Sequence, residues 1–351
     1  MIHATGSPPD SVAGRTLPGS ADRPAAVAQH RAALSPAASR PRFSGIIPPL
    51  VTPLLDPDTL DPNGLERLVN HVLGGGVHGL FLLGTTGEGP ALSGRLQRDL
   101  IERAVAIVAG RVPVLVGITD ASPAESLELA GFAATAGADA VVAAPPYYFP
   151  AGQEPLIRWA LDLADRSPLP LVLYNMPEMT KLVLEPATLE RLAACERIVG
   201  LKDSSGDLGY FAAAAASVAG RRPDWSLLVG PEQLLPEAEA LGGHGAIPGG
   251  ANVWPRLFVE FFDAVQAADA AALARTRGRV AAVSRLYRIG RLPGGIIVGI
   301  KAALAALGIC RSVTAGPFEQ LDTEQRREVE RLIEDLGPTV GGTPGPAAPP
   351  P

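Results

Sequence analysis

Hydrophobic residues in this chain gather in short runs at regular intervals, and polar or amphipathic segments separate the runs. Turn-forming Gly, Pro, Asn and Asp residues bound most of the runs, which is typical of buried strands. The expected strands cover Gly45–Val51, Gly79–Leu83, Pro113–Ile118, Ala140–Ala144, Pro170–Tyr174, Ile198–Lys202, Ser226–Val229 and Gly245–Ile247.

The segments between these runs place apolar residues every three or four positions, as helices packed on a core do. The expected helices cover Gly64–Leu73, Gly94–Val108, Pro123–Thr135, Gln153–Asp165, Pro186–Ala194, Leu208–Val218, Glu232–Leu241 and Trp254–Ala267. This alternation predicts a parallel sheet, and eight units of this length favour a (β/α)8 TIM barrel. An open, doubly wound sheet is the alternative, less favoured because no Gly-x-Gly-x-x-Gly turn follows the first strand.

Beyond Ala267 the pattern becomes wholly helical, over about 270–289, 295–307 and 322–336. We therefore expect a barrel catalytic domain over 43–268 and a C-terminal helical region, an appendix on the barrel, over 269–337. Residues 1–42 and 338–351 lack apolar periodicity, which predicts a disordered extension and a disordered tail. A targeting peptide is the other interpretation of the first segment, but no apolar stretch supports it.

Composition excludes several classes of function. The chain has 351 residues and a net charge of −6, so it offers no basic surface for nucleic acid or an anionic membrane. No apolar run approaches the ~18 residues of a membrane helix. Two cysteines provide no disulfide framework, and no histidine is spaced with carboxylates as a metal ligand, so we expect no metal and no cofactor. A reducing cytoplasm is the default location.

Lysine is rare in this chain, although basic residues are not. Of 30 Lys and Arg residues only three are lysines, Lys181, Lys202 and Lys301. Lys202 ends an apolar run that is predicted to be a buried strand. A lysine there is badly placed to act as a solvated surface residue. Burial disfavours the charged form of a lysine, and a neutral amine can attack a ketone to form a Schiff base. Arginine cannot substitute, because its guanidinium stays protonated. A lysine that merely extends to solvent from a strand end is the alternative.

Chemistry in a barrel belongs at the carboxyl ends of the strands. Those ends hold the phenols Tyr148 and Tyr174, which can relay protons, with a threonine hydroxyl between them. The Gly84–Gly89 loop has small residues and opens toward a helix, so its backbone N–H groups can approach a carboxylate. A 2-oxo acid such as pyruvate has both the ketone and the carboxylate that this set would accept.

Four motifs together resemble the dihydrodipicolinate synthase / N-acetylneuraminate lyase family. They are Gly84-Thr85-Thr86-Gly87-Glu88, Tyr147-Tyr148, Tyr174-Asn175-x-Pro177 and Gly200-Leu201-Lys202-Asp203. The spacings between Thr85, Tyr148, Tyr174 and Lys202 are also similar, and the resemblance spans about Phe43 to Gly337. It implies a class I, Schiff-base-forming lyase or aldolase on a barrel that assembles as a homotetramer, a dimer of dimers.

The resemblance also implies a role for each matching residue. Lys202 would be the Schiff-base lysine and Tyr174 the general acid/base. Thr85 would connect Tyr174 to Tyr148, the latter reaching in from a neighbouring subunit. Thr86 would hold the pyruvate carboxylate, and Ile247 would line the pyruvate pocket.

The second substrate is where the chain departs from the resemblance. Met179 stands where dihydrodipicolinate synthases carry an Arg that grips the carboxylate of aspartate semialdehyde. We therefore expect an aldolase, or a dehydratase, for another 2-oxo acid, of the 2-keto-3-deoxy sugar acid type. Glu232, Gln233, Ser204 and Ser205 are candidates to bind its hydroxyls. A 4-hydroxy-tetrahydrodipicolinate synthase with a relocated Arg is one alternative, and a catalytically retired barrel that binds a 2-oxo acid is another.

Overall fold

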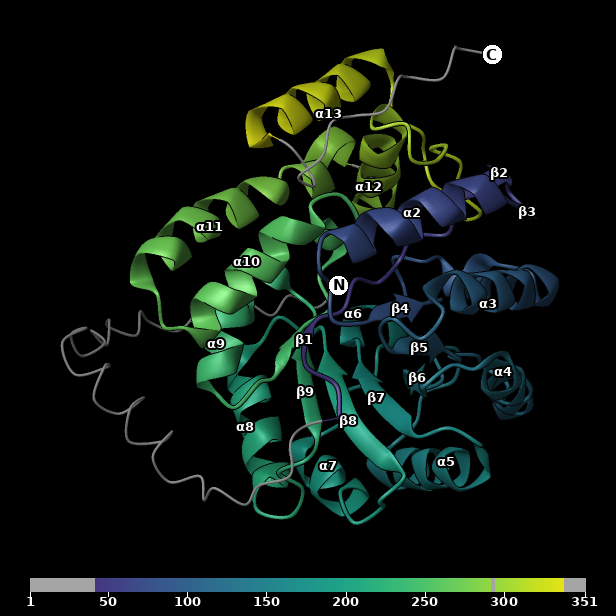
Figure 1. Ribbon diagram of the computed structural model, residues 1–351. Coiled ribbons are helices and arrows are strands. Elements are labelled where there is room, and N and C mark those ends of the chain that lie inside the picture. Colours follow the sequence, from purple (N-terminus) through teal and green to yellow (C-terminus); the bar gives the residue numbers. More distant parts are fainter. Residues whose placement is uncertain (1–41, 292–293, 338–351) are drawn as a thin grey trace, which may run out of the picture. The chain divides into compact units, whose positions relative to one another are not determined.

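Eight short parallel strands form the central sheet of the described part of the chain, residues 42–291 and 294–337 of a computed structural model (Figure 1). They are β1 (Gly45–Ile46), β4 (Leu80–Leu82), β5 (Val114–Gly117), β6 (Ala140–Ala143), β7 (Leu171–Asn175), β8 (Ile198–Asp203), β9 (Ser226–Val229) and β10 (Gly245–Ala246). Their order in the sheet is β1-β10-β9-β8-β7-β6-β5-β4. Apart from the two end strands, each strand pairs with its neighbours along the chain, as in the predicted TIM barrel.

The two end strands of this sheet, β1 and β4, meet through the segment that follows β1. Pro49 bridges Phe81 in parallel, and the Leu50 N–H donates to the Phe81 carbonyl at 2.9 Å. The Phe81 N–H in turn donates to the Pro48 carbonyl at 2.9 Å. The expected strand over 45–51 is shortened to two residues because Pro48 and Pro49 have no N–H to donate to a ladder.

Helices cover the outside of this sheet (Figure 1). They are α2 (Pro62–Gly74), α3 (Gly94–Val108), α4 (Pro123–Ala136), α5 (Gln153–Arg166), α7 (Pro186–Leu192), α8 (Leu208–Ala219), α9 (Leu235–Ala240) and α10 (Pro255–Gln266). Side-chain caps begin four of them: Asp61, Ser93, Ser122 and Asp207 each accept a backbone N–H of the first turn. Such caps satisfy donors that a helix leaves unpaired at its start.

Short elements that the pattern did not predict lie mostly in the loops after strands. They are the hairpin β2 (Leu54–Asp56) and β3 (Thr59–Leu60), the 3-10 turns η1 (Gly89–Ala91) and η3 (Gly249–Asn252), and helix α6 (Pro177–Thr180). Two to four residues carry too little periodicity to be recognised in a sequence. The helix expected over Glu232–Leu241 begins as a 3-10 turn, η2 (Glu232–Leu234), and continues as α9.

The C-terminal region consists of α11 (Ala270–Val283), η4 (Leu286–Arg291), α12 (Gly295–Ala306) and α13 (Thr323–Leu336). Helix α12 packs against η4, α13 and η3, and η3 is the turn that follows strand β10. Its sequence carries one charge, Lys301, among Gly, Ala, Ile, Leu and Val residues. An almost wholly apolar helix is buried on several sides, and this one is. The appendix therefore rests on the carboxyl ends of the strands.

Two apolar clusters fill the described structure. The larger lies between strands and helices, and the smaller groups inward-facing strand residues such as Phe81, Val172, Leu228 and Ile247. Tyr174 belongs to the smaller cluster. The interior of the barrel is thus packed, and its upper end carries a phenol.

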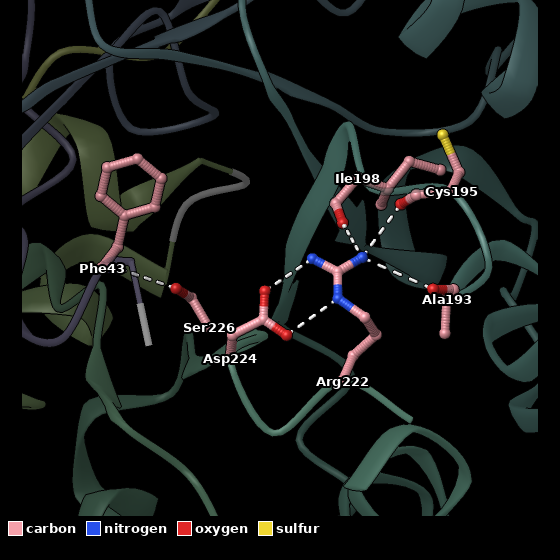
Figure 2. Close-up of polar contacts among 7 residues, drawn as sticks. All are labelled: Phe43, Ala193, Cys195, Ile198, Arg222, Asp224 and Ser226. Atoms are coloured by element: carbon pink, nitrogen blue, oxygen red, sulfur yellow. Dashed lines mark hydrogen bonds and ion pairs between the residues drawn. The ribbon is translucent and has the colours of Figure 1, made fainter. Parts of the chain in front are cut away.

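The amino-terminal ends of the strands are joined by polar contacts that involve no candidate site residue (Figure 2). The Arg222 guanidinium pairs with Asp224 at 2.7 Å and donates to the carbonyls of Ala193, Cys195 and Ile198. Nearby, the Phe43 N–H donates to the Ser226 hydroxyl at 2.8 Å. These bonds connect the starts of β1, β8 and β9, which is a stabilising role at the end of the barrel opposite the expected chemistry.

Three predictions remain as they were. The extension over 1–42, apart from Arg42, and the tail over 338–351 lie outside the described residues. The division of the rest at residue 268 stays a prediction. Within 42–291 and 294–337, no helix is long and apolar enough to cross a membrane.

Candidate active site

Lys202 lies on β8 at the carboxyl end of the strand and is 4 % exposed. It is in register with Tyr174 on β7. Its Nζ lies 4.0 Å from the centre of the Tyr174 ring and 4.9 Å from that of Phe81. Among the residues that the structure describes, no carboxylate forms an ion pair with Lys202. The amine is therefore enclosed by two aromatic faces and has no counter-ion among the described residues, so no carboxylate competes with a carbonyl substrate for it.

The Tyr174 phenol is the group best placed to move protons beside Lys202. Its oxygen lies 3.3 Å from the Thr85 Oγ1. Burial alone would raise the pKa of this phenol, but the positive charge of Lys202 and hydrogen bonds with Thr85 and Ser204 outweigh burial. The pKa of Tyr174 is consequently lowered from its ordinary value. A lower pKa makes the phenol a better proton donor and makes its phenolate form easier to reach.

The Gly84–Gly89 loop places Thr85 against Tyr174 and is held closed by its own backbone. The Glu88 N–H donates to the Thr85 carbonyl at 3.0 Å, and the Gly89 N–H donates to that of Gly84 at 3.2 Å. A side chain at Gly89 would lie 2.1 Å from the Leu83 carbonyl oxygen, so only glycine fits there. The glycines thus permit a tight turn that presents two adjacent hydroxyls.

Glu88 anchors this loop to the C-terminal appendix. Its backbone is left-handed, with φ of 59°, a conformation that costs a non-glycine residue about 1–2 kcal/mol. Its carboxylate forms an ion pair with Lys301 and accepts the Ala315 N–H at 2.7 Å. Lys301 also donates to the Val313 carbonyl at 2.6 Å. Both side chains are buried, so the strained backbone is held by a fully enclosed charge pair.

A second buried network lies behind the two reactive strands. The Asn175 amide donates to Asp203 at 2.8 Å, and Asn175 Oδ1 accepts the Leu184 N–H at 3.1 Å. Asp203 also accepts the Ser205 hydroxyl at 2.9 Å. Burial raises the pKa of Asp203, despite these hydrogen bonds. Asn175 directly follows Tyr174, and Asp203 directly follows Lys202. The bond between them therefore fixes the register of Tyr174 against Lys202.

The structure brings together only part of the predicted site. Tyr174 contacts both Thr85 and Lys202, and Ile247 shares the inner apolar cluster of Tyr174. Thr86 is 8 % exposed on the same loop as Thr85. Tyr148, in contrast, is 76 % exposed, and its ring contacts Phe149 at 5.0 Å between centres. No contact joins it to the Thr85 hydroxyl within the described chain.

The candidates for hydroxyl binding fare differently. Both Glu232 oxygens are occupied, one by the Tyr287 hydroxyl at 2.6 Å and one by the Gly250 N–H at 3.0 Å. Because Glu232 is also buried, these bonds tie η2 to the appendix, and substrate binding by Glu232 stays a prediction. Ser205 is bound by Asp203, while Ser204 contacts the Tyr174 phenol.

Sequence reasoning did not foresee Phe81, the second aromatic face near Lys202, or Ser204 as a partner of Tyr174. Phe81 reads in the sequence as one more apolar strand residue. The signal for Ser204 was its position two residues after Lys202, at the end of the strand, which does not distinguish a partner of Tyr174 from a group that binds substrate. The described residues contain no group of three His, Cys, Asp or Glu side chains arranged to bind a metal.

A buried lysine and phenol at the carboxyl end of a parallel barrel define an enzyme class, the lyases that form a lysine Schiff base. Comparison with known proteins gives the family. The sequence profile of the Dihydrodipicolinate synthetase family matches residues 42–336, so the chain belongs to that family.

Relatives in this family carry two kinds of names. A 4-hydroxy-tetrahydrodipicolinate synthase of Ruegeria pomeroyi is 35% identical over 295 residues, covering 84% of this chain and 99% of the relative. A probable 2-dehydro-3-deoxy-D-pentonate aldolase, YjhH of Escherichia coli, is 36% identical over 298 residues, covering 84% and 98%. Curated relatives of similar overall identity thus differ in the activity named for them.

Solved structures agree on the fold. A dihydrodipicolinate synthase from Bacteroides thetaiotaomicron has a TM-score of 0.81 and 45% identity, covering 85% of this chain and all of that one. YagE of E. coli, a member of the dihydrodipicolinic acid synthase family in complex with pyruvate, has a TM-score of 0.80 and 31% identity, covering 84% and 99%. The predicted fold class and family are both confirmed.

Proposed function

We propose that this enzyme forms a Schiff base between Lys202 and pyruvate and joins the resulting enamine to an aldehyde, or reverses that reaction. The observation that carries the proposal is the Lys202 amine 4.0 Å from the Tyr174 ring, in an enclosed site with no paired carboxylate among the described residues. A carboxylate partner would stabilise the charged form of an amine, and an amine must give up its proton before it can attack a ketone.

The reaction follows from these groups. The Lys202 amine attacks the ketone carbon, and loss of water gives an iminium that withdraws electrons from the adjacent methyl group. The Tyr174 phenolate takes a proton from this methyl group to give an enamine, whose carbon attacks the aldehyde carbon as a new C–C bond forms. Tyr174 donates a proton to the alkoxide that develops, and hydrolysis of the iminium releases the product and restores Lys202. Thr85 holds the Tyr174 hydroxyl, and the cleavage direction runs through the same steps backwards.

The substrate carboxylate is assigned to the Gly84–Gly89 loop. Thr86 offers a hydroxyl and a backbone N–H there, and Ile247 supplies an apolar wall for the pyruvyl methyl group. Charge-assisted hydrogen bonds to a carboxylate are stronger than neutral ones, so two donors suffice to orient a small 2-oxo acid.

For the aldehyde half we propose a 2-keto-3-deoxy sugar acid type of substrate. Met179 is 52 % exposed at the end of α6, and a thioether cannot form the bidentate contact by which Arg holds a carboxylate. The similarity to YjhH supports an aldolase of this kind. A 4-hydroxy-tetrahydrodipicolinate synthase is the second candidate, supported by the Ruegeria relative. Aspartate semialdehyde tests this candidate: condensation with pyruvate by the wild type would support it, whereas condensation gained only in Met179→Arg would show that the wild type lacks this contact.

Assembly is proposed from the exposure of the aromatic loop after β6. Tyr147, Tyr148 and Phe149 are 41, 76 and 74 % exposed, and large apolar side chains gathered on a surface mark an interface. We assign this loop to a subunit contact in a homotetramer, with Tyr148 approaching Thr85 of the neighbouring subunit. Cytoplasmic location is proposed alongside it.

The deciding experiment is intact-mass spectrometry of the protein after incubation with pyruvate and sodium borohydride. We expect a pyruvyl adduct on the wild type and none on Lys202→Ala, with Lys181→Ala as the matched control that keeps the adduct. An adduct that persists in Lys202→Ala would move the nucleophile elsewhere. No adduct on the wild type would overturn the proposal in favour of a catalytically retired barrel.

A further inference from the structure

The pair formed by Glu88 and Lys301 has no part in the chemistry described above, yet it is the most deeply enclosed charge pair of the described chain. Lys301 is 0 % and Glu88 3 % exposed. The nine other ion pairs in the described ranges each have at least one side chain that is 14 % exposed or more. Burying two charges costs several kcal/mol per ion, so a chain gains little stability from such a pair. Its value lies in fixing one arrangement of the two segments that it joins.

The segments joined are the loop that carries Thr85 and Thr86 and the helical appendix. From Lys301 the chain of contacts runs to the Glu88 carboxylate, and from the Glu88 N–H to the Thr85 carbonyl. The Ala315 and Gly316 N–H groups approach the second Glu88 oxygen, at 2.7 and 3.4 Å. The loop is therefore held from outside the barrel by α12 and by the segment that precedes α13.

The left-handed backbone of Glu88 indicates that its side chain is needed at this position. A glycine would adopt the same φ without strain, but it would have no carboxylate to reach α12. The chain thus has a strained glutamate at a position where glycine would be unstrained. What glutamate offers and glycine lacks is the bond to Lys301. If the bond is removed, the turn loses the force that holds Glu88 in place, and Thr85 and Thr86 move with it.

We propose that Glu88 and Lys301 are positioning residues through which the C-terminal appendix holds the Thr85–Thr86 turn in the geometry that receives the 2-oxo acid carboxylate. The inference rests on the proposed function, because it assumes that this turn binds pyruvate. It adds that the appendix, which contributes no side chain to the reacting pair, is required for substrate affinity. Loss of the pair is expected to weaken pyruvate binding far more than it slows the chemistry at Lys202.

The test measures the rate of borohydride trapping as a function of pyruvate concentration in the full-length protein. The variants are Lys301→Met, Glu88→Gln and the double variant. We expect each to raise the half-saturating pyruvate concentration about five-fold or more, the loss that accompanies one weakened charge-assisted hydrogen bond. The limiting trapping rate reports attack by the Lys202 amine, which none of the variants touches, so it should stay within about two-fold of the wild type.

Thermal melting of the same proteins separates positioning from stability. Each single variant leaves one buried charge unpaired and should melt well below the wild type, whereas the double variant leaves none and should recover most of that loss. Its half-saturating concentration should nevertheless remain raised. Arg222→Met is the matched control: it breaks an ion pair at the opposite end of the barrel, so it should lower the melting temperature without changing pyruvate affinity.

The outcomes decide between the ideas. Half-saturation that is unchanged in all three variants, or that recovers with stability in the double variant, overturns the positioning role and leaves the pair purely structural. The same holds if Arg222→Met raises half-saturation equally. An adduct on the wild type shows that such a result concerns only this inference; a wild type that forms no adduct overturns the proposed function and this inference with it.

Discussion

Two buried lysines in two regions of this molecule have opposite surroundings. Lys202, in the barrel, is enclosed by the rings of Tyr174 and Phe81. Lys301, in the appendix, is enclosed with the carboxylate of Glu88 and the carbonyl of Val313. Burial lowers the pKa of Lys301, and the adjacent Glu88 carboxylate opposes that effect. Burial alone therefore does not mark a nucleophile; a buried amine without a counter-ion does.

The largest effect is expected when each lysine is replaced by arginine, which keeps the positive charge but cannot act as a nucleophile. Lys202→Arg should abolish the borohydride-trapped adduct and lower turnover by at least about 10⁴-fold, because a guanidinium stays protonated and forms no Schiff base. Lys301→Arg keeps the charge opposite Glu88 and should still give the adduct. The measurement is intact mass together with turnover in any aldehyde assay that succeeds. Adduct formation by Lys202→Arg would show that the nucleophile is another amine, and its loss in Lys301→Arg would show that the two lysines had been assigned the wrong way round.

The phenol beside Lys202 gives the next largest effect. Tyr174→Phe keeps the ring against the amine but removes the proton donor, so turnover should fall about 10²–10⁴-fold. Tyr210→Phe is the matched control, since the Tyr210 hydroxyl donates to the Leu184 carbonyl at 2.6 Å outside the reacting pair. Steady-state rates of the two variants test this, and equal losses in both would assign the Tyr174 effect to packing.

The sequence alone predicted the strands and the special position of Lys202, but not the surroundings of Lys301. The two periodicities predicted all eight strands, because a buried parallel strand is a short apolar run and its crossover helix is amphipathic. Lys202 was recognisable because it interrupts such a run. No role for Lys301 in an ion pair could be predicted, since its partner Glu88 lies 213 positions earlier and no local pattern connects them. Glu232 was assigned to substrate for the same reason: its partner Tyr287 comes from the appendix.

Lys301 should matter more than Lys202 for stability, although Lys202 matters more for activity. Lys301→Met leaves the Glu88 carboxylate buried and unpaired, so the free energy of unfolding should fall by about 3–5 kcal/mol. Lys202→Met replaces an amine that has no counter-ion in the described structure with an apolar chain of similar length, and should leave stability unchanged or raise it by about 1 kcal/mol. Denaturant unfolding of both variants is the measurement. A large loss in Lys202→Met would mean that its amine has a stabilising partner after all.

The two buried glutamates extend the comparison to pH. Glu88 faces Lys301, whereas no Lys or Arg of the described ranges forms an ion pair with Glu232, and burial raises the pKa of Glu232 to about 7. The folded protein therefore holds this proton more tightly than the unfolded chain does. The resulting stability is fully present below about pH 4.5, the usual pKa of the side chain, and is lost as pH rises through 7.

Glu232→Gln is neutral at every pH and should remove this dependence. Between pH 5 and 7.5 the wild type should lose up to about 3 kcal/mol relative to Glu232→Gln, as the raised pKa requires. Unfolding free energies of both proteins at several pH values in this range give the difference directly, which cancels the titration of every other group. A difference that is flat across the range would mean that Glu232 is ionised throughout, stabilised by the Tyr287 hydroxyl and the Gly250 N–H alone. Hydrogen bonds would then do for Glu232 what Lys301 does for Glu88, and the contrast between paired and unpaired buried charges would hold only for the lysines.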